Sequence, residues 1–321
     1  ELLLKGTGVH KNIEEALKFI KMSIDKGNIN AMYQYGLMLL FGDVIEINKV
    51  EAAKYLKMSA DKGQIDSMLT YGKMKFYGDG IPADKEEGIK YIKKSADEGN
   101  CEAMLIYGRK HLFGEEGIPI NKQEGIKYIK MAADKGNEEA IFDYGRYLEV
   151  GEYMRVNKKE AAKYYQIAVS KGNDCAMNNY GLMLLNGYGV PMDKKEGLRL
   201  IKMSAEKGNT EGMFNYAVML ENGVNVPINK KEALRYLKMS ADKGHTGAMH
   251  NYGMLLLKGK RTPEIEKEAL KYFKMSADAG SDISLYQLGS MHLTGDVVEK
   301  NIEKAAQYFK LSADKGNILS M

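Results

Sequence analysis

A glycine-ended segment that recurs along the chain constrains the fold more than any other feature. One copy, Lys194–Gly208, reads KKEGLRLIKMSAEKG, and edited copies end at Gly27, Gly63, Gly99, Gly136, Gly172, Gly208, Gly244, Gly280 and Gly316. These closing glycines are 36 residues apart, except for one step of 37. A fixed period of this length is typical of solenoids, in which each unit packs mainly on its neighbours.

The first half of each repeat has the pattern of an α-helix, which we call helix A. An apolar residue such as Met177 is followed three positions later by a tyrosine such as Tyr180, and this spacing predicts one buried helical face. A glycine comes next in most copies: Gly36, Gly72, Gly108, Gly145, Gly181, Gly253 and Gly289, with Ala217 in the remaining one. Because a mid-helix glycine costs roughly 1 kcal/mol relative to alanine, its recurrence predicts a crowded contact between helices.

Helix A is expected over residues 30–41 in the first full repeat. It should end at a glycine in the left-handed conformation, which has no Cβ to resist it. The candidates are Gly42, Gly78, Gly114, Gly151, Gly187, Gly223, Gly259 and Gly295, and the turns after them often contain proline.

A second helix, helix B, is expected over residues 48–62 and then every 36 residues, shifted by one after Gly117. Its start is marked by an Asn or Asp with a Glu three positions later, which is a capping box. The pairs are Asn12/Glu15, Asn48/Glu51, Asp84/Glu87, Asn121/Glu124, Asn157/Glu160, Asp193/Glu196 and Asn229/Glu232. Two later copies depart from this pattern, because Ile265 takes the cap position before Glu268 and Lys304 replaces the glutamate after Asn301.

The chain is thus predicted to be one all-α repeat array over residues 1–321, an α/α superhelical solenoid. It would hold a partial helix A at 1–5, a helix B at 12–26, eight A–B repeats at 29–316 and the start of a further helix A at 317–321. The incomplete repeats and the absence of an initial Met indicate a piece of a longer array.

Composition and motifs argue against several classes of function. The 47 basic and 43 acidic residues are too evenly balanced to indicate a nucleic-acid partner, and no apolar run approaches the ~18 residues of a membrane span. The five histidines lack metal-binding spacing, and there is no P-loop, G-x-S-x-G or dinucleotide motif, so we expect no catalytic residues, metal or cofactor. No Asn-x-Ser/Thr acceptor occurs, which favours a cytoplasmic location.

Three residue classes allow a chemical and a structural interpretation. The helix-A methionine stripe that includes Met177 and Met213, and the helix-B methionines such as Met58 and Met239, favour core packing over a soft-metal site. Cys101 and Cys175 are too few for a disulfide scaffold; each lies near a helix start, where an ordinary thiol and an activated thiol are the alternatives. Two lysine rows on helix B have acidic residues three before the first row and four after most of the second, so a solvated, ion-paired face is favoured over a phosphate-binding stripe.

The segments Ala176–Asn209 and Gly212–Met249 resemble Sel-1-like repeats, relatives of the tetratricopeptide repeat. The resemblance covers essentially the whole chain and implies a right-handed α/α superhelix. It also implies an adaptor that holds proteins together. A secreted branch of the family carries a disulfide in each repeat and has been ascribed weak penicillin-binding or hydrolysing activity, but no repeat here has paired cysteines.

The resemblance also points to a binding face on helix A. In the tetratricopeptide pattern, an asparagine at the position of Asn179, Asn215 and Asn251 faces the inner groove, where its amide can donate to and accept from an extended peptide. Nearby positions expected on the same side are Asn178, Asn186, Asn222, His250 and Lys258, and in the first half Lys73, Tyr77, Arg109, Phe113 and Arg146. A solvated helix surface is the alternative.

The expected function is therefore a scaffold or adaptor that binds a protein or an extended peptide on its concave helix-A face. Two alternatives remain: a weak hydrolase like the disulfide-stapled relatives, and a spacer attached to a catalytic domain outside this sequence.

Overall fold

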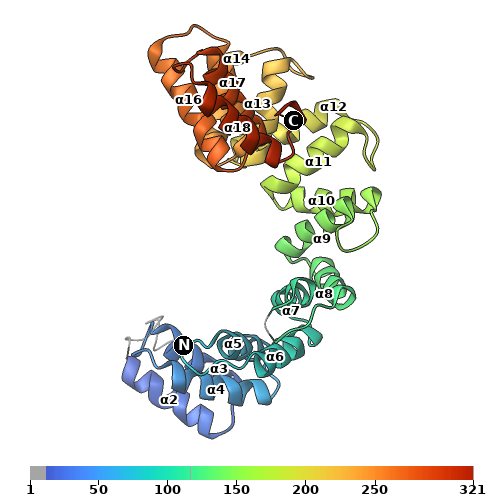
Figure 1. Ribbon diagram of the computed structural model, residues 1–321. Helices are drawn as coiled ribbons and strands as arrows, with labels where there is room; N and C mark the ends of the chain where they lie inside the picture. The colour runs from blue at the N-terminus through green and yellow to red at the C-terminus, as the bar shows by residue number, and fades with distance from the viewer. Residues whose placement is uncertain (1–11, 116, 321) are drawn as a thin grey trace. The chain divides into compact units, whose positions relative to one another are not determined.

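The computed structural model describes residues 12–115 and 117–320, and these residues form α-helices without a β-strand (Figure 1). The A helices are α3 (Ile29–Phe41), α5 (Ile65–Tyr77), α7 (Cys101–Phe113), α9 (Glu138–Val150), α11 (Asp174–Asn186), α13 (Thr210–Asn222), α15 (Thr246–Leu257) and α17 (Asp282–Thr294). The B helices are α2 (Ile13–Asp25), α4 (Lys49–Asp61), α6 (Lys85–Asp97), α8 (Lys122–Asp134), α10 (Lys158–Ser170), α12 (Lys194–Glu206), α14 (Lys230–Asp242), α16 (Pro263–Asp278) and α18 (Ile302–Asp314).

The helices form two compact units, Glu1–Val156 and Asn157–Met321, called unit 1 and unit 2 below. Within each unit, successive helices pack on one another in sequence order, as a solenoid requires. The all-α repeat fold predicted from the sequence is confirmed. That all repeats form one array stays a prediction; residues 1–5 lie outside the described chain, and residues 318–320 form a single 3₁₀ turn.

Most helix ends follow the predicted signals. The Asn48 side chain accepts a hydrogen bond from the Glu51 backbone N–H at 3.0 Å, and Asn301 still caps its helix although Lys304 replaces the glutamate. Helix A has caps of its own that the sequence reasoning missed: the residue after each closing glycine, for example Asn173, accepts from the third residue of the helix. Each helix start thus has a satisfied backbone donor.

Two predicted helix ends are wrong, both in the connection between α15 and α16. At a third position, Gly114 ends α7 as predicted, but its ψ of 156° is not that of the predicted left-handed cap. Helix α16 begins at Pro263 with Thr262 as its cap, three residues before the predicted cap Ile265. Proline suits the first helical position because the missing N–H would have no intrahelical partner there. Helix α15 ends at Leu257, and its C-cap is Lys258, whose backbone is in the right-handed helical conformation. Gly259 therefore does not adopt the left-handed conformation that Gly187 has (φ +69°).

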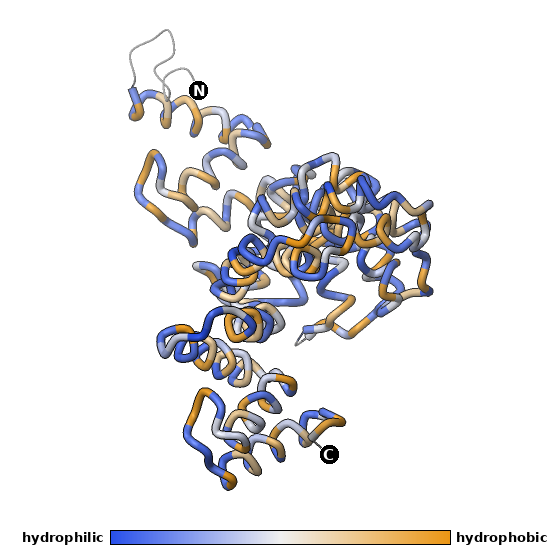
Figure 2. The backbone as a smooth tube through the Cα atoms, turned by 90° about the horizontal axis from the view of Figure 1, so that it is seen from above, coloured by the Kyte–Doolittle hydropathy of each residue, from blue (hydrophilic) through white to orange (hydrophobic). Residues whose placement is uncertain are grey.

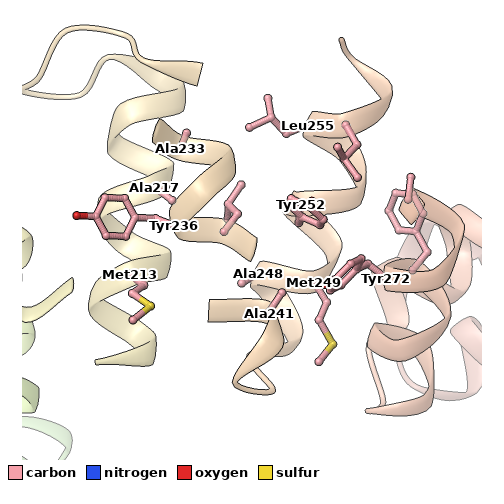
Figure 3. Close-up of a cluster of buried hydrophobic side chains, with 14 of the residues drawn as sticks. Met213, Ala217, Ala233, Tyr236, Ala241, Ala248, Met249, Tyr252, Leu255 and Tyr272 are labelled. Carbon is pink, nitrogen blue, oxygen red and sulfur yellow. The ribbon is translucent and has the colours of Figure 1, made fainter. Parts of the chain in front are cut away.

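The core of unit 2 shows how a repeat packs (Figure 3). Met213 and Met249 are buried beside the small residues Ala217, Ala241 and Ala248. The helix-A tyrosine meets the helix-B tyrosine edge to face, with ring centroids 4.8 Å apart for Tyr252 and Tyr272. The predicted core packing is confirmed for the helix-A methionine stripe, but it is wrong for the helix-B methionines Met22, Met58 and Met239, which are exposed. Figure 2 shows hydrophobic and hydrophilic residues alternating along the helices, as the amphipathic pattern requires.

The mid-helix Gly181 of α11 lies against the first turn of α12, which contains Gly197. A Cβ on Gly181 would lie 2.7 Å from Ile201 Cγ1 and 2.9 Å from the Gly197 carbonyl oxygen. A Cβ on Gly197 would in turn lie 2.7 Å from the Gly181 carbonyl oxygen. The crowding predicted from the sequence is therefore confirmed, and it involves backbone on both sides.

Candidate partner-binding face

Each A helix leaves one row of side chains outside the core. In α5 the row is Asp66, Thr70, Lys73 and Tyr77, each half-buried or exposed, and most residues between them are buried. The spacing of four, three and four residues is that of one helical face. We call this row the A-helix stripe. Counted from the mid-helix glycine, which is Gly72 in α5, its positions lie six and two residues before the glycine and one and five residues after it.

In unit 1 the stripe has apolar or aromatic residues at its last position. Their exposed fractions are 61% for Phe41, 59% for Tyr77, 51% for Phe113 and 60% for Val150. They occupy the same register in four successive A helices, so they are repeated and not scattered. Single exposed apolar residues are ordinary, whereas a row of them marks an interaction surface.

Charged residues in the middle of the unit 1 stripe link neighbouring A helices. Lys73 Nζ lies 2.9 Å from Glu102 of the next A helix. Arg109 Nε donates to Asp143 Oδ2 at 3.0 Å, and its Nη2 lies 2.8 Å from Glu139. Arg146 instead has its partners within its own repeat: it lies 3.7 Å from Glu152 in the connection after α9 and stacks over the Tyr147 ring. Three of the predicted site residues thus already have charged partners in this unit.

In unit 2 the stripe carries asparagine side chains, and these differ in how many hydrogen bonds they make to other residues of the fold. Asn179 Nδ2 donates to the buried Tyr165 hydroxyl at 3.2 Å, and Asn215 Nδ2 donates to Asn178 Oδ1 at 2.9 Å. Asn186 and Asn222 are exposed and donate only to carbonyls one turn back in their own helices. Asn251 is half-buried and has no hydrogen-bond partner among the described residues.

Two residues expected on the stripe lie between repeats instead. Asn178 is 4% exposed and donates to Asn179 Oδ1, so it is one link in a chain of hydrogen bonds from Tyr165 to Asn215. His250 Nδ1 lies 3.0 Å from the buried Ser284 hydroxyl, and burial lowers the pKa of His250. Both residues stand one position before the asparagine row, which turns them about 100° around the helix toward the neighbouring repeat. Lys258 does lie on the stripe, 2.8 Å from Glu221 of the preceding A helix.

The helix-B lysines are held in contacts that the sequence reasoning missed. Lys238 Nζ donates to the Tyr272 hydroxyl of the next B helix at 2.9 Å, that hydroxyl donates to Asp242, and Lys238 lies 3.2 Å from Asp242. The same arrangement joins Lys57, Asp61 and Tyr91, and also Lys93, Asp97 and Tyr128. We call each set a helix-B clasp. The predicted ion pairs are confirmed for most of the second basic row and, in the first row, for Arg199 and Arg235. The signal of the clasps in the sequence was a spacing of 34 residues from lysine to tyrosine, or 35 across the 37-residue step.

The Tyr272→Phe substitution is expected to lower the stability of unit 2 at neutral pH by about 0.5–1.5 kcal/mol, toward the lower end because Asp242 is half-exposed. The Tyr272 hydroxyl lowers the pKa of the Asp242 carboxyl. A lowered folded-state pKa stabilises the fold above the ordinary value of 3.8, and this contribution is lost as the pH falls through the folded-state pKa.

Thermal melting of both proteins from pH 7 to pH 3 tests this expectation. The difference between them should be largest near neutrality and shrink below pH ~4. Tyr236→Phe is the matched control, because the Tyr236 hydroxyl bonds no carboxylate among the described residues. A difference that grows as the pH falls would contradict the clasp.

The two cysteines are the remaining chemical candidates. Cys101 and Cys175 are both free, and burial together with the Asp174 charge raises the pKa of the Cys175 thiol, opposite to an activated nucleophile. In the described ranges, no group of three or more His, Cys, Asp or Glu side chains could hold a metal ion. None of the described helices is both long and apolar enough to cross a bilayer.

Comparison with known proteins agrees with the repeat geometry. The Sel1 repeat family model matches residues 1–28, 29–64, 65–100, 101–137, 138–173, 176–209, 210–245, 246–281 and 283–317. No curated protein sequence matches the chain.

Two solved structures share the fold over 99% of this chain. One is a Sel1 repeat protein from Oxalobacter formigenes, at 23% identity and TM-score 0.74, with 90% of that protein covered. The other is a protective antigen of uropathogenic Escherichia coli that displays an SLR fold, at 22% identity and TM-score 0.72, with 76% of it covered. With nine matched repeats spanning nearly all residues, the chain belongs to the Sel1 repeat family.

Proposed function

We propose that this chain is a protein-interaction scaffold that binds an extended peptide or a partner protein along the A-helix stripe. The observation that carries the proposal is the row of exposed apolar residues in one register of unit 1: Phe41, Tyr77, Phe113 and Val150. The core does not bury these side chains, and covering them with a partner would gain about 25 cal/mol per Å² of apolar surface. Sel1 repeat proteins generally act as interaction scaffolds, which agrees with this reading.

Polar groups on the unit 2 stripe also support the A-helix stripe as the binding face. The Asn251 amide has a donor and an acceptor that no described residue uses, and the Asn186 and Asn222 oxygens take part in no hydrogen bond among the described residues. An extended peptide backbone offers complementary groups at regular spacing. The helix-B face is a weaker candidate because several of its lysines are already engaged in clasps.

A combinatorial array of decapeptides tests the proposal with two triple variants. The stripe variant carries Asn186→Ala, Asn222→Ala and Asn251→Ala, since these amides hold no neighbouring helix. The control carries Lys202→Ala, Lys274→Ala and Lys310→Ala, helix-B lysines outside the clasps. Because a hydrogen bond contributes roughly 0.5–1.5 kcal/mol net, the stripe variant should lose tenfold or more in affinity.

Before binding is measured, the melting temperatures of both variants are compared with that of the parent protein to confirm that the variants are folded. The lysine control should bind the same peptides as the parent protein, and only the dependence of its affinity on salt concentration should change. Loss of binding by the lysine control, with binding kept by the stripe variant, would assign the interaction to the helix-B face and overturn the proposal.

A further inference from the structure

A pocket of about 390 Å³ opens on the unit 1 stripe among α3, α5 and α7. Its lining includes the buried side chains of Leu40, Leu69 and Met74, and also the exposed Phe41 and Tyr77. Pockets of this size accept small molecules or the side chains of a peptide. The two exposed aromatic residues are thus part of a concave site and not only of a flat row.

Acidic groups dominate the polar part of the lining. Asp66, Asp79 and Glu102 contribute three carboxylates against the single ammonium group of Lys73. Lys73 is paired with Glu102, and Asp79 is paired with Lys49 from outside the lining. The lining charge is therefore −2, and Lys49 compensates one of these two charges.

Asp66 is the carboxylate left without a cation. It accepts hydrogen bonds from Asn100 Nδ2 at 3.2 Å and from Gln64 Nε2 at 3.5 Å. No lysine or arginine is paired with it in the part of the chain that the structure describes. Asp66 lines the pocket and is exposed, so a ligand cation can reach its carboxylate while remaining partly hydrated.

We propose that this pocket binds a linear protein segment that inserts a large apolar side chain and places a lysine or arginine beside it, against Asp66. The proposal rests on the scaffold function proposed above and names the chemistry of the partner. Charge complementarity decides the partner class, because an acidic rim repels the phosphates of nucleic acids and of anionic membranes and attracts a basic segment.

The same register in unit 2 supports a site confined to unit 1. There the last stripe position holds Asn186, Asn222, Lys258 and Thr294 in place of the apolar and aromatic residues of unit 1. Asparagine is thus a natural occupant of this register in the same chain. The substitutions Phe41→Asn and Tyr77→Asn should remove the apolar walls while leaving the helices intact.

Fluorescence anisotropy with labelled decapeptides tests the pocket directly. Four peptides share one Gly/Ser frame and differ only in an anchor residue and its neighbour: Phe with Arg, Phe with Ser, Phe with Glu, and Ser with Arg. The unsubstituted protein should bind the Phe/Arg peptide at least tenfold tighter than the Ser/Arg and Phe/Glu peptides.

Three variants separate the contributions. The Phe41→Asn/Tyr77→Asn protein should lose the preference for Phe over Ser. The Asp66→Asn protein should bind the Phe/Arg peptide no more tightly than the Phe/Ser peptide, and its affinity for the Phe/Ser peptide should equal that of the parent protein. Phe19→Asn removes another exposed aromatic side chain of unit 1, on helix α2 outside the stripe, and should behave like the parent protein.

Equal affinities for the four peptides, a preference for Phe/Glu, or no binding of any of them would overturn the pocket proposal. So would a Phe19→Asn protein as impaired as the pocket variant. The asparagine triple variant of unit 2 tests the scaffold function separately: if it loses its array peptides while the pocket experiment fails, the scaffold function stands and only the partner chemistry is wrong.

Discussion

The Gly181→Leu protein is expected to be less stable than the parent protein by about 1–3 kcal/mol or more. Its protection from hydrogen exchange should fall most in α11 and α12. The first added carbon would lie 2.7 Å from Ile201 and 2.9 Å from the Gly197 carbonyl oxygen. A backbone oxygen cannot move aside as the end of a flexible side chain can, so the two helices must separate. In a repeat protein the lost interface also weakens the neighbouring repeats.

Alanine substitutions in one register isolate this effect. A methyl group at Gly181 meets the Gly197 carbonyl oxygen and the Ile201 side chain, whereas the three atoms nearest to one at Gly253 all belong to the Phe273 ring, from 2.8 Å. Alanine favours a helix over glycine by about 1 kcal/mol in both positions, so the two differ only in what the new methyl group contacts. Thermal melting with hydrogen exchange should show Gly181→Ala to be the more damaging of the two. If Gly181→Leu melted like the parent protein, the crowding would not be real.

Gly187→Val is expected to destabilise unit 2 by about 1–3 kcal/mol for a different reason. Gly187 has a φ of +69°, and the nearest atom to an added Cβ is 3.7 Å away, so space is available. The cost comes from the backbone, because a β-branched residue in the left-handed region is strained. The same substitution at Gly259, in the same register but outside that region, should cost less than half as much.

Denaturant unfolding of the two valine variants measures this difference. Gly187 is half-buried and Gly259 is exposed, but an added Cβ has room at both positions, with nearest atoms 3.7 Å and 3.4 Å away. Equal destabilisation at the two positions would mean that glycine is needed there for space or solubility and not for its left-handed conformation.

The sequence predicted the fold well because the signals repeat. The glycine period, the capping boxes and the apolar spacing each occur in nearly every copy, so helix ends such as Phe41 and Asp61 fall within one residue of the prediction. The errors occur where one copy departs from the pattern: around Gly259, Thr262 and Pro263 the local cap and the proline move the helix start.

The candidate site was harder to predict because it depends on contacts between repeats. Spacing within one helix correctly leaves Lys73, Tyr77, Asn222 and Lys258 outside the core, whereas their place on a concave face stays a prediction. It cannot show that Asn178 is buried against the next repeat, since that depends on how adjacent helices rotate. The clasp of Lys238, Asp242 and Tyr272 was hidden for the same reason, although all three rows are visible in the sequence.

Hydrogen exchange with a bound peptide from the decapeptide array tests the central claim most directly, because it reports where the peptide lies without assuming which residues matter. Binding along the A-helix stripe predicts new protection in the A helices, centred on α3 and α5 for a Phe/Arg peptide, with the B helices unchanged. Protection concentrated in the B helices, around Lys57, Lys93 and Lys238, would contradict the account and place the partner on the opposite, charged face.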